Sequence, residues 1–225
     1  RMLRWAVENE LAEPSVYEGC KAVTGLRKGR SAARESAPVK PVPLADVNAV
    51  EPFLCAELWT MIQLQLVTGM RPGEACIMRM ADIDRTGEVW AYRPQSHKTQ
   101  HHGRERIIFL GTKAQVLIHP YLSADRERYL FSPQRAEADR NATRRENRMS
   151  PMTPSQAARQ PKDEPIRAAG DCYHRQSYTK AIARACKLAV IPLWSPNRLR
   201  HNAATELRKE FGLEAARTVL GHSES

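Results

Sequence analysis

The stretch Thr68-Gly69-Met70-Arg71-Pro72-Gly73-Glu74 joins two predicted helices. Gly69 ends the first helix, because a glycine adopts the left-handed C-cap conformation at little steric cost. Pro72 suits the first turn of the second helix, since its missing N–H would have no partner there. Arg71 adds its charge to the positive end of a helix dipole, which indicates an anion-binding role, and Glu74 lies one turn on, where it can hold the guanidinium. By itself, the stretch also fits a capped helix with a surface ion pair.

Apolar periodicity on either side of this stretch predicts a mainly helical chain. Leu58, Ile62 and Leu66 repeat every four residues and predict the buried stripe of the preceding helix. Asp46 is predicted to cap a shorter helix that runs through Leu54. After the stretch we predict, in chain order, a helix end near Met80, strands at 88–93 and 106–110, a helix at 114–122, an extended piece at 128–131, an irregular insertion at 132–170, and helices at 173–188, 197–211 and 213–220. The predicted fold class is mainly α with a small antiparallel β-sheet (α+β).

The 225 residues suffice for one or two domains. Residues 1–27 are predicted to form a helix and its exit, 28–43 a basic, proline-rich linker, and 44–225 the globular domain. The first piece is too short to be a domain, so we expect it to be the last element of a preceding domain or an arm that lies on the next one. Because the chain begins at Arg1 rather than at an initiator methionine, we expect a fragment of a longer protein.

The charge of the chain points to a polyanionic partner. Lys and Arg number 35 against 25 Asp and Glu, which gives a formal net charge of +10. Nucleic acid is the commonest polyanion, and an anionic membrane surface is the alternative. No apolar run reaches the roughly 20 residues of a membrane span, and no helix combines a basic face with large apolar residues. With no signal peptide visible, we expect a cytoplasmic protein.

The sequence gives little support to metal chemistry. Its five cysteines are scattered, odd in number and without a C-x-x-C pair, which argues against a zinc site and against a disulfide framework. A metal-dependent hydrolase that uses His101 and His102 is a further alternative, but adjacent strand residues point to opposite faces. No H-E-x-x-H motif or carboxylate cluster accompanies them. We therefore expect no metal and no cofactor.

Three further motifs place polar residues at the ends of predicted elements. His97-Lys98-Thr99 lies in the turn between two strands, and Leu220-Gly221-His222-Ser223 ends a helix. In Asn197-Arg198-Leu199-Arg200-His201, positions 197, 200 and 201 share one helix face. Each motif alone fits a solvated surface. Together they supply two arginines, a lysine and histidines, which suit metal-free phosphoryl transfer, because arginine matches the oxygens of the transition state and lysine or histidine can move a proton.

In this order, the four motifs resemble those of the tyrosine recombinases, also called phage-type integrases. The resemblance covers residues 44–225 and implies the catalytic-domain fold of that family. It also implies that residues 1–27 are the end of a separate core-binding domain, which forms a clamp around DNA together with the catalytic domain.

The resemblance implies a role for each motif. Arg71 and Arg200 match the two arginines that grip the scissile phosphate. Lys98 matches the hairpin lysine, the general acid for the 5′-hydroxyl leaving group. His222 matches the histidine that hydrogen-bonds the phosphate, and Glu74 matches the acidic residue that supports the site from behind.

Two departures from the family pattern bear on activity. Asn197 stands where the family usually has a histidine, and asparagine cannot act as a base at neutral pH. We expect the site to work without that base; the alternatives are that a neighbour such as His201 contributes or that activity is weakened. The nucleophilic tyrosine of the family lies shortly beyond the L-G-H motif, and none of the six tyrosines of this chain fits that position. We therefore expect the nucleophile beyond residue 225 and no cleavage by these residues alone.

The resemblance thus implies a site-specific recombinase or integrase of a mobile element. It would break and rejoin DNA through a 3′-phosphotyrosyl intermediate. Its expected partners are double-stranded DNA and, in the full-length protein, three further copies in a homotetramer on paired sites. The alternative is a non-catalytic DNA-binding protein derived from an integrase, which the missing tyrosine and Asn197 favour.

Overall fold

The computed structural model of the chain describes residues 2–26, 29–30, 32, 34–35, 37–96, 105–159 and 168–221. The chain divides into two compact units, Arg1–Val39 and Lys40–Ser225. The first contains two helices, α1 (Met2–Glu8) and α2 (Pro14–Ala22), where the sequence predicted one. The prediction is wrong because Glu10 takes a left-handed φ of 57° and Pro14 starts a new helix at its first position.

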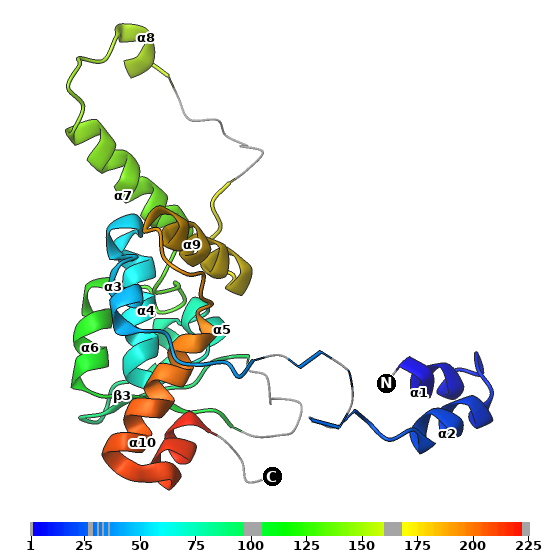
Figure 1. Cartoon of the computed structure of the whole chain (residues 1–225). Coiled ribbons are helices and arrows are strands. Elements are labelled where there is room, and N and C mark those ends of the chain that lie inside the picture. Colours follow the sequence, from blue (N-terminus) through cyan, green and yellow to red (C-terminus); the bar gives the residue numbers. More distant parts are fainter. Residues whose placement is uncertain are drawn as a thin grey trace. The chain divides into compact units, whose positions relative to one another are not determined.

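The second unit is built around α4 (Ala56–Thr68), which contacts α10 (Asn197–Leu220), α6 (Thr112–Ile118) and α5 (Pro72–Cys76) (Figure 1). Met61, Ile62 and Leu64 of α4 are fully buried, so this helix is buried around much of its circumference. Of the predicted stripe, Leu58 and Ile62 lie in the core and Leu66 packs against it in a partly buried position. The central helix was therefore predicted with nearly the right boundaries and with a narrower buried face than it has.

The turn between α4 and α5 is as the sequence predicted at its two ends. Gly69 caps α4 with a φ of 65°, and its N–H donates to the Gln65 carbonyl at 2.9 Å. The side-chain amide of Gln65 donates to the carbonyl of Met70 at 3.0 Å, and Pro72 occupies the first position of α5. These bonds fix the backbone immediately before Arg71.

α5 ends at Cys76 instead of near Met80. After it, the carbonyl of Met78 accepts a hydrogen bond from Leu130 N–H at 2.9 Å, and Arg79 forms an isolated antiparallel bridge with Tyr129. This pairing with a distant segment holds the chain extended and stops the helix early. A 3₁₀ turn, η2 (Met80–Asp82), then leads into the sheet.

The sheet has three short antiparallel strands in the order β1-β2-β3: β1 (Ile83–Asp84), β2 (Trp90–Tyr92) and β3 (Ile108–Leu110). The two predicted strands are present in shorter form, and β1 was missed. In the register, Tyr92 lies opposite both Ile83 and Ile108. Tyr92, Ile108 and Leu110 face the core, whereas Phe109 is exposed, as the alternation of a half-buried strand requires.

Two predicted short helices differ from the structure. α3 spans Leu44–Asn48 with Pro43 as its N-cap, so Asp46 lies in its first turn and does not cap it. The chain then forms a 3₁₀ turn, η1 (Glu51–Phe53), instead of a continuous helix to Leu54. The helix predicted at 114–122 consists of α6 and a 3₁₀ turn, η4 (His119–Tyr121).

The insertion predicted to be irregular contains two helices, α7 (Pro133–Glu146) and α8 (Pro154–Ala157). No residue of α7 is buried, which is why its sequence shows no apolar period. The start of α7 is held by Ser132, whose hydroxyl accepts from Arg135 N–H at 3.5 Å, and by an ion pair of 2.6 Å between Arg135 Nε and Glu57 Oε1. The prediction of an irregular segment failed because α7 is stabilised by an N-cap and by a carboxylate far away in the sequence, and neither produces an apolar period.

The last two helices follow the predictions closely. α9 spans Arg175–Leu188, and its Tyr178 is fully buried, with a hydroxyl that donates to Gln65 Oε1 at 2.9 Å. α10 is interrupted at Gly212, whose φ of 83° and ψ of 178° are not helical, so it corresponds to the two predicted helices. Within the described ranges, no helix is both long and apolar enough to cross a membrane. All five cysteines are free thiols.

Candidate active site

A pocket of about 800 Å³ lies where the α4–α5 turn meets the first turns of α10. Its polar lining contains five residues that the sequence singled out: Arg71, Glu74, Asn197, Arg200 and His201. These residues come from two motifs that are more than 120 positions apart along the chain. The fold therefore brings the first-arginine motif and the second-arginine motif into one concave site.

Glu74 holds Arg71 in place from two directions. Its Oε1 lies 2.8 Å from Arg71 Nη1, and its Oε2 accepts from the backbone N–H of Arg71 at 2.7 Å. The Glu74 side chain is only 3% exposed, whereas Arg71 retains 24% of its side-chain exposure toward the pocket. The backbone carbonyl of Glu74 accepts a hydrogen bond of 2.8 Å from the buried Tyr92 hydroxyl. Arg71 is thus oriented by a buried carboxylate while its guanidinium stays accessible.

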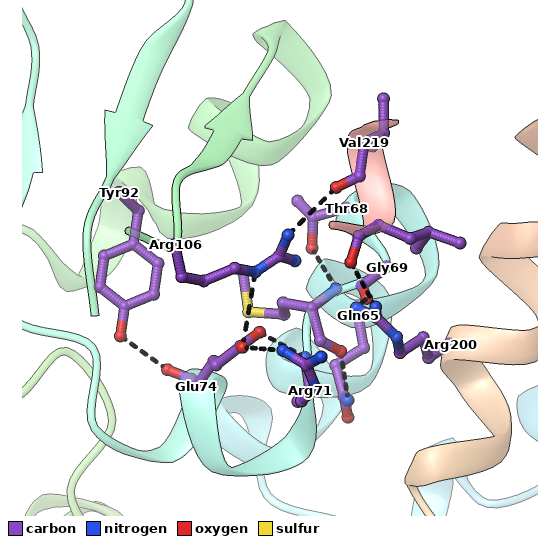
Figure 2. A network of polar contacts seen from close by, with 11 residues as sticks. Gln65, Thr68, Gly69, Arg71, Glu74, Tyr92, Arg106, Arg200 and Val219 are labelled. Carbon is purple, nitrogen blue, oxygen red and sulfur yellow. Dashed lines mark hydrogen bonds and ion pairs between the residues drawn. The ribbon is translucent and has the colours of Figure 1, made fainter. Parts of the chain in front are cut away.

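Arg200 is more deeply buried than Arg71. Its Nη1 donates to the carbonyl of Gly69 at 2.6 Å, and its Nη2 donates to the carbonyl of Leu220 (Figure 2). Burial, followed by the positive charges of Arg71 and Arg106, lowers the pKa of Arg200 to about 10, so it remains charged at neutral pH. Among the described residues, no carboxylate forms an ion pair with it. Arg200 therefore presents a positive charge that is fixed by neutral carbonyls.

The first turn of α10 presents its polar residues as the spacing predicted. Asn197, Arg200 and His201 line the pocket, whereas Leu199 is fully buried in the core. Arg198 points elsewhere and donates to the carbonyls of Lys40 and Pro41 at 2.8 and 3.0 Å. This confirms that positions 197, 200 and 201 share a face.

Sequence reasoning missed Arg106, which lies just before β3. Its Nε is 3.5 Å from Glu74 Oε1, and its Nη1 donates to the carbonyl of Val219 at 3.3 Å (Figure 2). Burial lowers the pKa of Arg106, and the neighbouring Arg71 lowers it further. The signal was available, because Arg106, Ile108 and Leu110 alternate along the strand and two of them are core residues.

Ser96 and Arg175 also line the pocket and were missed. Ser96 follows the sheet, and Arg175 is the first residue of α9. Neither belongs to a motif in the sequence, so only the packing of α9 beside α5 could reveal Arg175.

Lys98 and His222 lie outside the described residues, as do His101 and His102. Their predicted roles are therefore not tested. Of their described neighbours, Ser96 and Leu220 line the pocket.

The described residues offer neither a metal site nor a tyrosine at this pocket. They contain no group of three His, Cys, Asp or Glu side chains that could hold a metal ion. All six tyrosines are described and none lines the pocket; the hydroxyls of Tyr92 and Tyr178, for example, are engaged in buried hydrogen bonds. The pocket can hold a phosphate between fixed guanidinium groups, and these residues do not supply it with a nucleophile.

Residues 48–225 match the sequence model of the phage integrase family. Because this match covers well over half of the chain, the protein belongs to the phage integrase family, the tyrosine recombinases. No match was found among curated protein sequences.

Solved structures of tyrosine recombinases share the fold. A lambda integrase fragment (75–356), solved as a dimer bound to a COC′ core site, is 14% identical with a TM-score of 0.59 and covers 100% of this chain and 74% of its own. The Tn1549 transposon integrase in complex with circular intermediate DNA is 17% identical with a TM-score of 0.54, and the match covers 93% of this chain and 68% of the integrase chain. XerA recombinase is 16% identical with a TM-score of 0.51, and the match covers 98% of this chain and 71% of the XerA chain. At these identities the likeness establishes the fold, that of a tyrosine-recombinase catalytic domain.

Proposed function

We propose that the protein is a site-specific DNA recombinase or integrase that transfers phosphoryl groups without a metal. The observation that carries this proposal is the convergence of Arg71 and Arg200 in one pocket, each fixed by buried partners. The net charge of +10 supports DNA as the substrate, since a polyanion is attracted to such a surplus. The family membership supports the same reaction class.

In the proposed mechanism, Arg71 and Arg200 bind the non-bridging oxygens of the scissile phosphate. Charge grows on these oxygens in the transition state, and preoriented guanidinium groups stabilise it without reorganising. Glu74 keeps Arg71 aimed at the phosphate through the 2.8 Å contact. The pocket volume of about 800 Å³ leaves room for a phosphodiester and its flanking sugars.

Proton transfer is assigned to residues beside these arginines. Lys98 would protonate the departing 5′-hydroxyl, and His222 would donate to a phosphate oxygen. Asn197 and His201 line the pocket where a base for the nucleophile is needed. Asn197 can orient a hydroxyl by hydrogen bonding, and the site then works without a side-chain base there.

The nucleophile of this proposal is a tyrosine from outside the 225 residues, because none of the six tyrosines of the chain lines the pocket. Its attack would form the 3′-phosphotyrosyl link and release the 5′-hydroxyl. These residues alone would bind DNA and orient the phosphate without cleaving it.

The remaining features are assigned by the same reasoning. Residues 1–27 would be the end of a core-binding domain, 28–43 a linker and 44–225 the catalytic domain. The lambda integrase that was solved as a tetramer bound to a Holliday junction supports assembly of four full-length copies on paired sites. The transposon integrase among the similar structures supports a role on a mobile element. The cytoplasm is part of the same proposal, as the compartment in which such a DNA recombinase would work.

A non-catalytic DNA-binding protein is the second candidate, because Asn197 replaces a family histidine. The structure gives a reason to prefer the enzyme. A protein that only binds DNA has no need for Arg200, a buried guanidinium without a carboxylate partner among the described residues, since burying such a charge costs stability.

Arg200→Ala tests the proposal in a longer clone that contains the tyrosine. Duplexes enriched from a random library by binding to the wild-type protein are nicked at successive positions, and covalent protein–DNA complexes are trapped. We expect wild-type complexes to accumulate and Arg200→Ala to lose at least about 10²-fold in rate, as for other preoriented donors. DNA affinity should fall little, because Arg200 would make only one of the many contacts that position the duplex.

Arg208→Ala is the matched control, since Arg208 is an exposed arginine on the same helix and does not line the pocket. It should cleave at the wild-type rate. DNA binding by the wild type with no covalent complex on any nicked duplex would favour the non-catalytic candidate.

A further inference from the structure

Arg106 is a guanidinium on the core-facing side of the sheet. It alternates with Ile108 and Leu110, which are 2% and 0% exposed, and is itself only 7% exposed. A charge in such a place loses its hydration, and the lowered pKa of Arg106 reflects that burial. Burying the Arg106 guanidinium therefore costs stability, and its contacts must offset that cost.

The contacts of Arg106 join two parts of the site. Its Nε lies 3.5 Å from Glu74 Oε1, on α5, and its Nη1 donates to the carbonyl of Val219, on the last turn of α10, at 3.3 Å. Gly221 passes so close that a Cβ there would lie 2.5 Å from Arg106 Nη1. Figure 2 shows the guanidinium between the Glu74 carboxylate and the end of α10.

The end of α10 is held by two arginines. The final carbonyls of a helix lack partners within it. Here the carbonyl of Val219 accepts from Arg106, and the carbonyl of Leu220 accepts from Arg200. Both carbonyls immediately precede Gly221 and the motif that contains His222. Arg106 thus holds the backbone that leads into the third motif.

We propose that Arg106 is a positioning residue that couples Glu74, and through it Arg71, to the segment that carries His222. It does not contact DNA, because it is buried and does not line the pocket. Its Nε and Nη2 have no hydrogen-bond partner in the described part of the chain, so the Val219 bond and the Glu74 charge are the contacts that hold it. This inference rests on the proposed function for its catalytic consequence, and the coupling itself concerns the folded chain alone.

The coupling is tested in the 225-residue chain by amide hydrogen exchange. Arg106→Met keeps the bulk and removes the charge, and Arg106→Lys keeps the charge without the forked donors. Both should raise exchange in the last turn of α10 by at least about 10-fold and leave its first turns unchanged. Arg93→Met is the matched control, because Arg93 is a nearby arginine whose ion pairs with Asp84 and Glu105 are exposed.

The catalytic consequence is tested by the covalent-trapping assay in the longer clone. The Arg106 variants should bind DNA within about twofold of the wild type, whereas cleavage should slow by about 10²-fold, because a misplacement of about 1 Å has that effect. Arg106→Lys should be intermediate, and it keeps the test informative if Arg106→Met does not fold.

Unchanged exchange at the end of α10 in a folded variant would overturn the coupling. Cleavage at the wild-type rate, or a loss of DNA affinity as large as the loss of rate, would overturn the positioning role while the proposed function stands. If the wild type itself forms no covalent complex, the proposed function fails, and hydrogen exchange still decides the coupling.

Discussion

At the scale of single residues, the site concentrates positive charge around one acid. Arg71, Arg106 and Arg200 lie close enough for their charges to influence one another, and Glu74 is the carboxylate among them. Three positive groups and one negative group leave a net charge of 3 − 1 = +2. In the proposed mechanism, the scissile phosphate would neutralise part of this excess, and the transition state would be bound most tightly, since it carries the most negative charge.

Glu57 is a second buried carboxylate, and it acts far from the pocket. Its Oε2 accepts from Ser132 N–H at 2.7 Å, and its Oε1 accepts from Arg135 Nε, so it anchors the start of α7 to α4. Burial raises the pKa of Glu57 above its ordinary value of 4.5, although Arg135 and the Ser132 N–H act in the opposite direction.

We expect Glu57→Gln to lower the free energy of unfolding by about 1–3 kcal/mol at pH 7.5, because the amide NH₂ faces one of the two donors. Since the pKa of Glu57 is higher in the folded chain, the folded chain binds this proton more tightly. The stabilisation that comes from this protonation of Glu57 is therefore lost as the pH rises from 4.5 through the folded pKa. The Gln variant lacks this titration. The gap between the two should be larger at pH 5 than at pH 7.5.

Urea unfolding at both pH values measures this gap, and Glu137→Gln is the control, because Glu137 is an exposed acid on α7. A gap that widens as the pH rises would show that the contacts with Arg135 outweigh burial.

At the scale of elements, the junction of α4, α5 and α10 depends on a glycine. Gly69 has a φ of 65°, and a Cβ there would lie 2.4 Å from Leu220 Cδ2. The carbonyl of Gly69 also accepts from Arg200. The close approach of α10 to the turn thus requires both the left-handed conformation and the absence of a side chain.

Gly69→Ala should therefore lower the free energy of unfolding by more than about 1 kcal/mol, from backbone strain plus the clash. It should also slow cleavage, because the clash displaces the end of α10 and the carbonyl that orients Arg200. Gly73→Ala is the control for stability, since Gly73 lies within α5 and a Cβ there meets nothing within 4 Å. Thermal unfolding of both variants checks the difference, and equal effects would mean that Leu220 moves away without cost.

The helices differ in how far their own sequences define them. The boundaries of α4, α9 and α10 follow from apolar periodicity, proline and glycine, which act within a few residues. The early end of α5 follows from the bridge between Arg79 and Tyr129, which are 50 positions apart. The helix of α7 follows from Ser132, Pro133 and the distant Glu57 instead of a buried face.

At the scale of the whole molecule, two features can be tested for a part in DNA binding: the net charge of the chain and the arm that contains most of α7 and all of α8. The arm, residues 138–167, carries seven of the basic residues and four of the acidic ones, so its net charge is 7 − 4 = +3. Its base is closed by a hydrogen bond of 3.3 Å from Gln134 N–H to the carbonyl of Gly170. Figure 1 shows α7 extending away from the helices around α4, with α8 farther along the arm.

We expect the DNA affinity of the chain to fall by about 10³-fold or more between roughly 50 and 200 mM salt, because phosphate contacts release counterions. Replacing residues 138–167 with a short glycine–serine linker lowers the net charge from +10 to 10 − 3 = +7. The pocket residues all lie outside the arm, so the shortened chain should keep a steep salt dependence. Its free energy of unfolding should stay within about 0.5 kcal/mol of the wild-type value, because α7 buries no residue.

Fluorescence anisotropy over a salt series measures how steeply the DNA affinity falls with salt concentration, for the full chain and for the chain without the arm. A flat slope in the full chain would contradict a phosphate-binding surface, and a flat slope only in the shortened chain would assign the DNA contacts to the arm.

The sequence by itself determined the α4–α5 turn, the polar face of the first turn of α10, the break at Gly212 and the family to which these motifs belong. The three structural features depend on residues within one or two helical turns of one another, where backbone sterics and side-chain spacing act directly, and the family follows from the order of four such short motifs along the chain. Only the tertiary structure decided that Arg106 reaches Val219, 113 positions away, and that Glu57 anchors α7. Such contacts are set by how the buried elements pack, and a buried charge finds its partner only once that packing has formed.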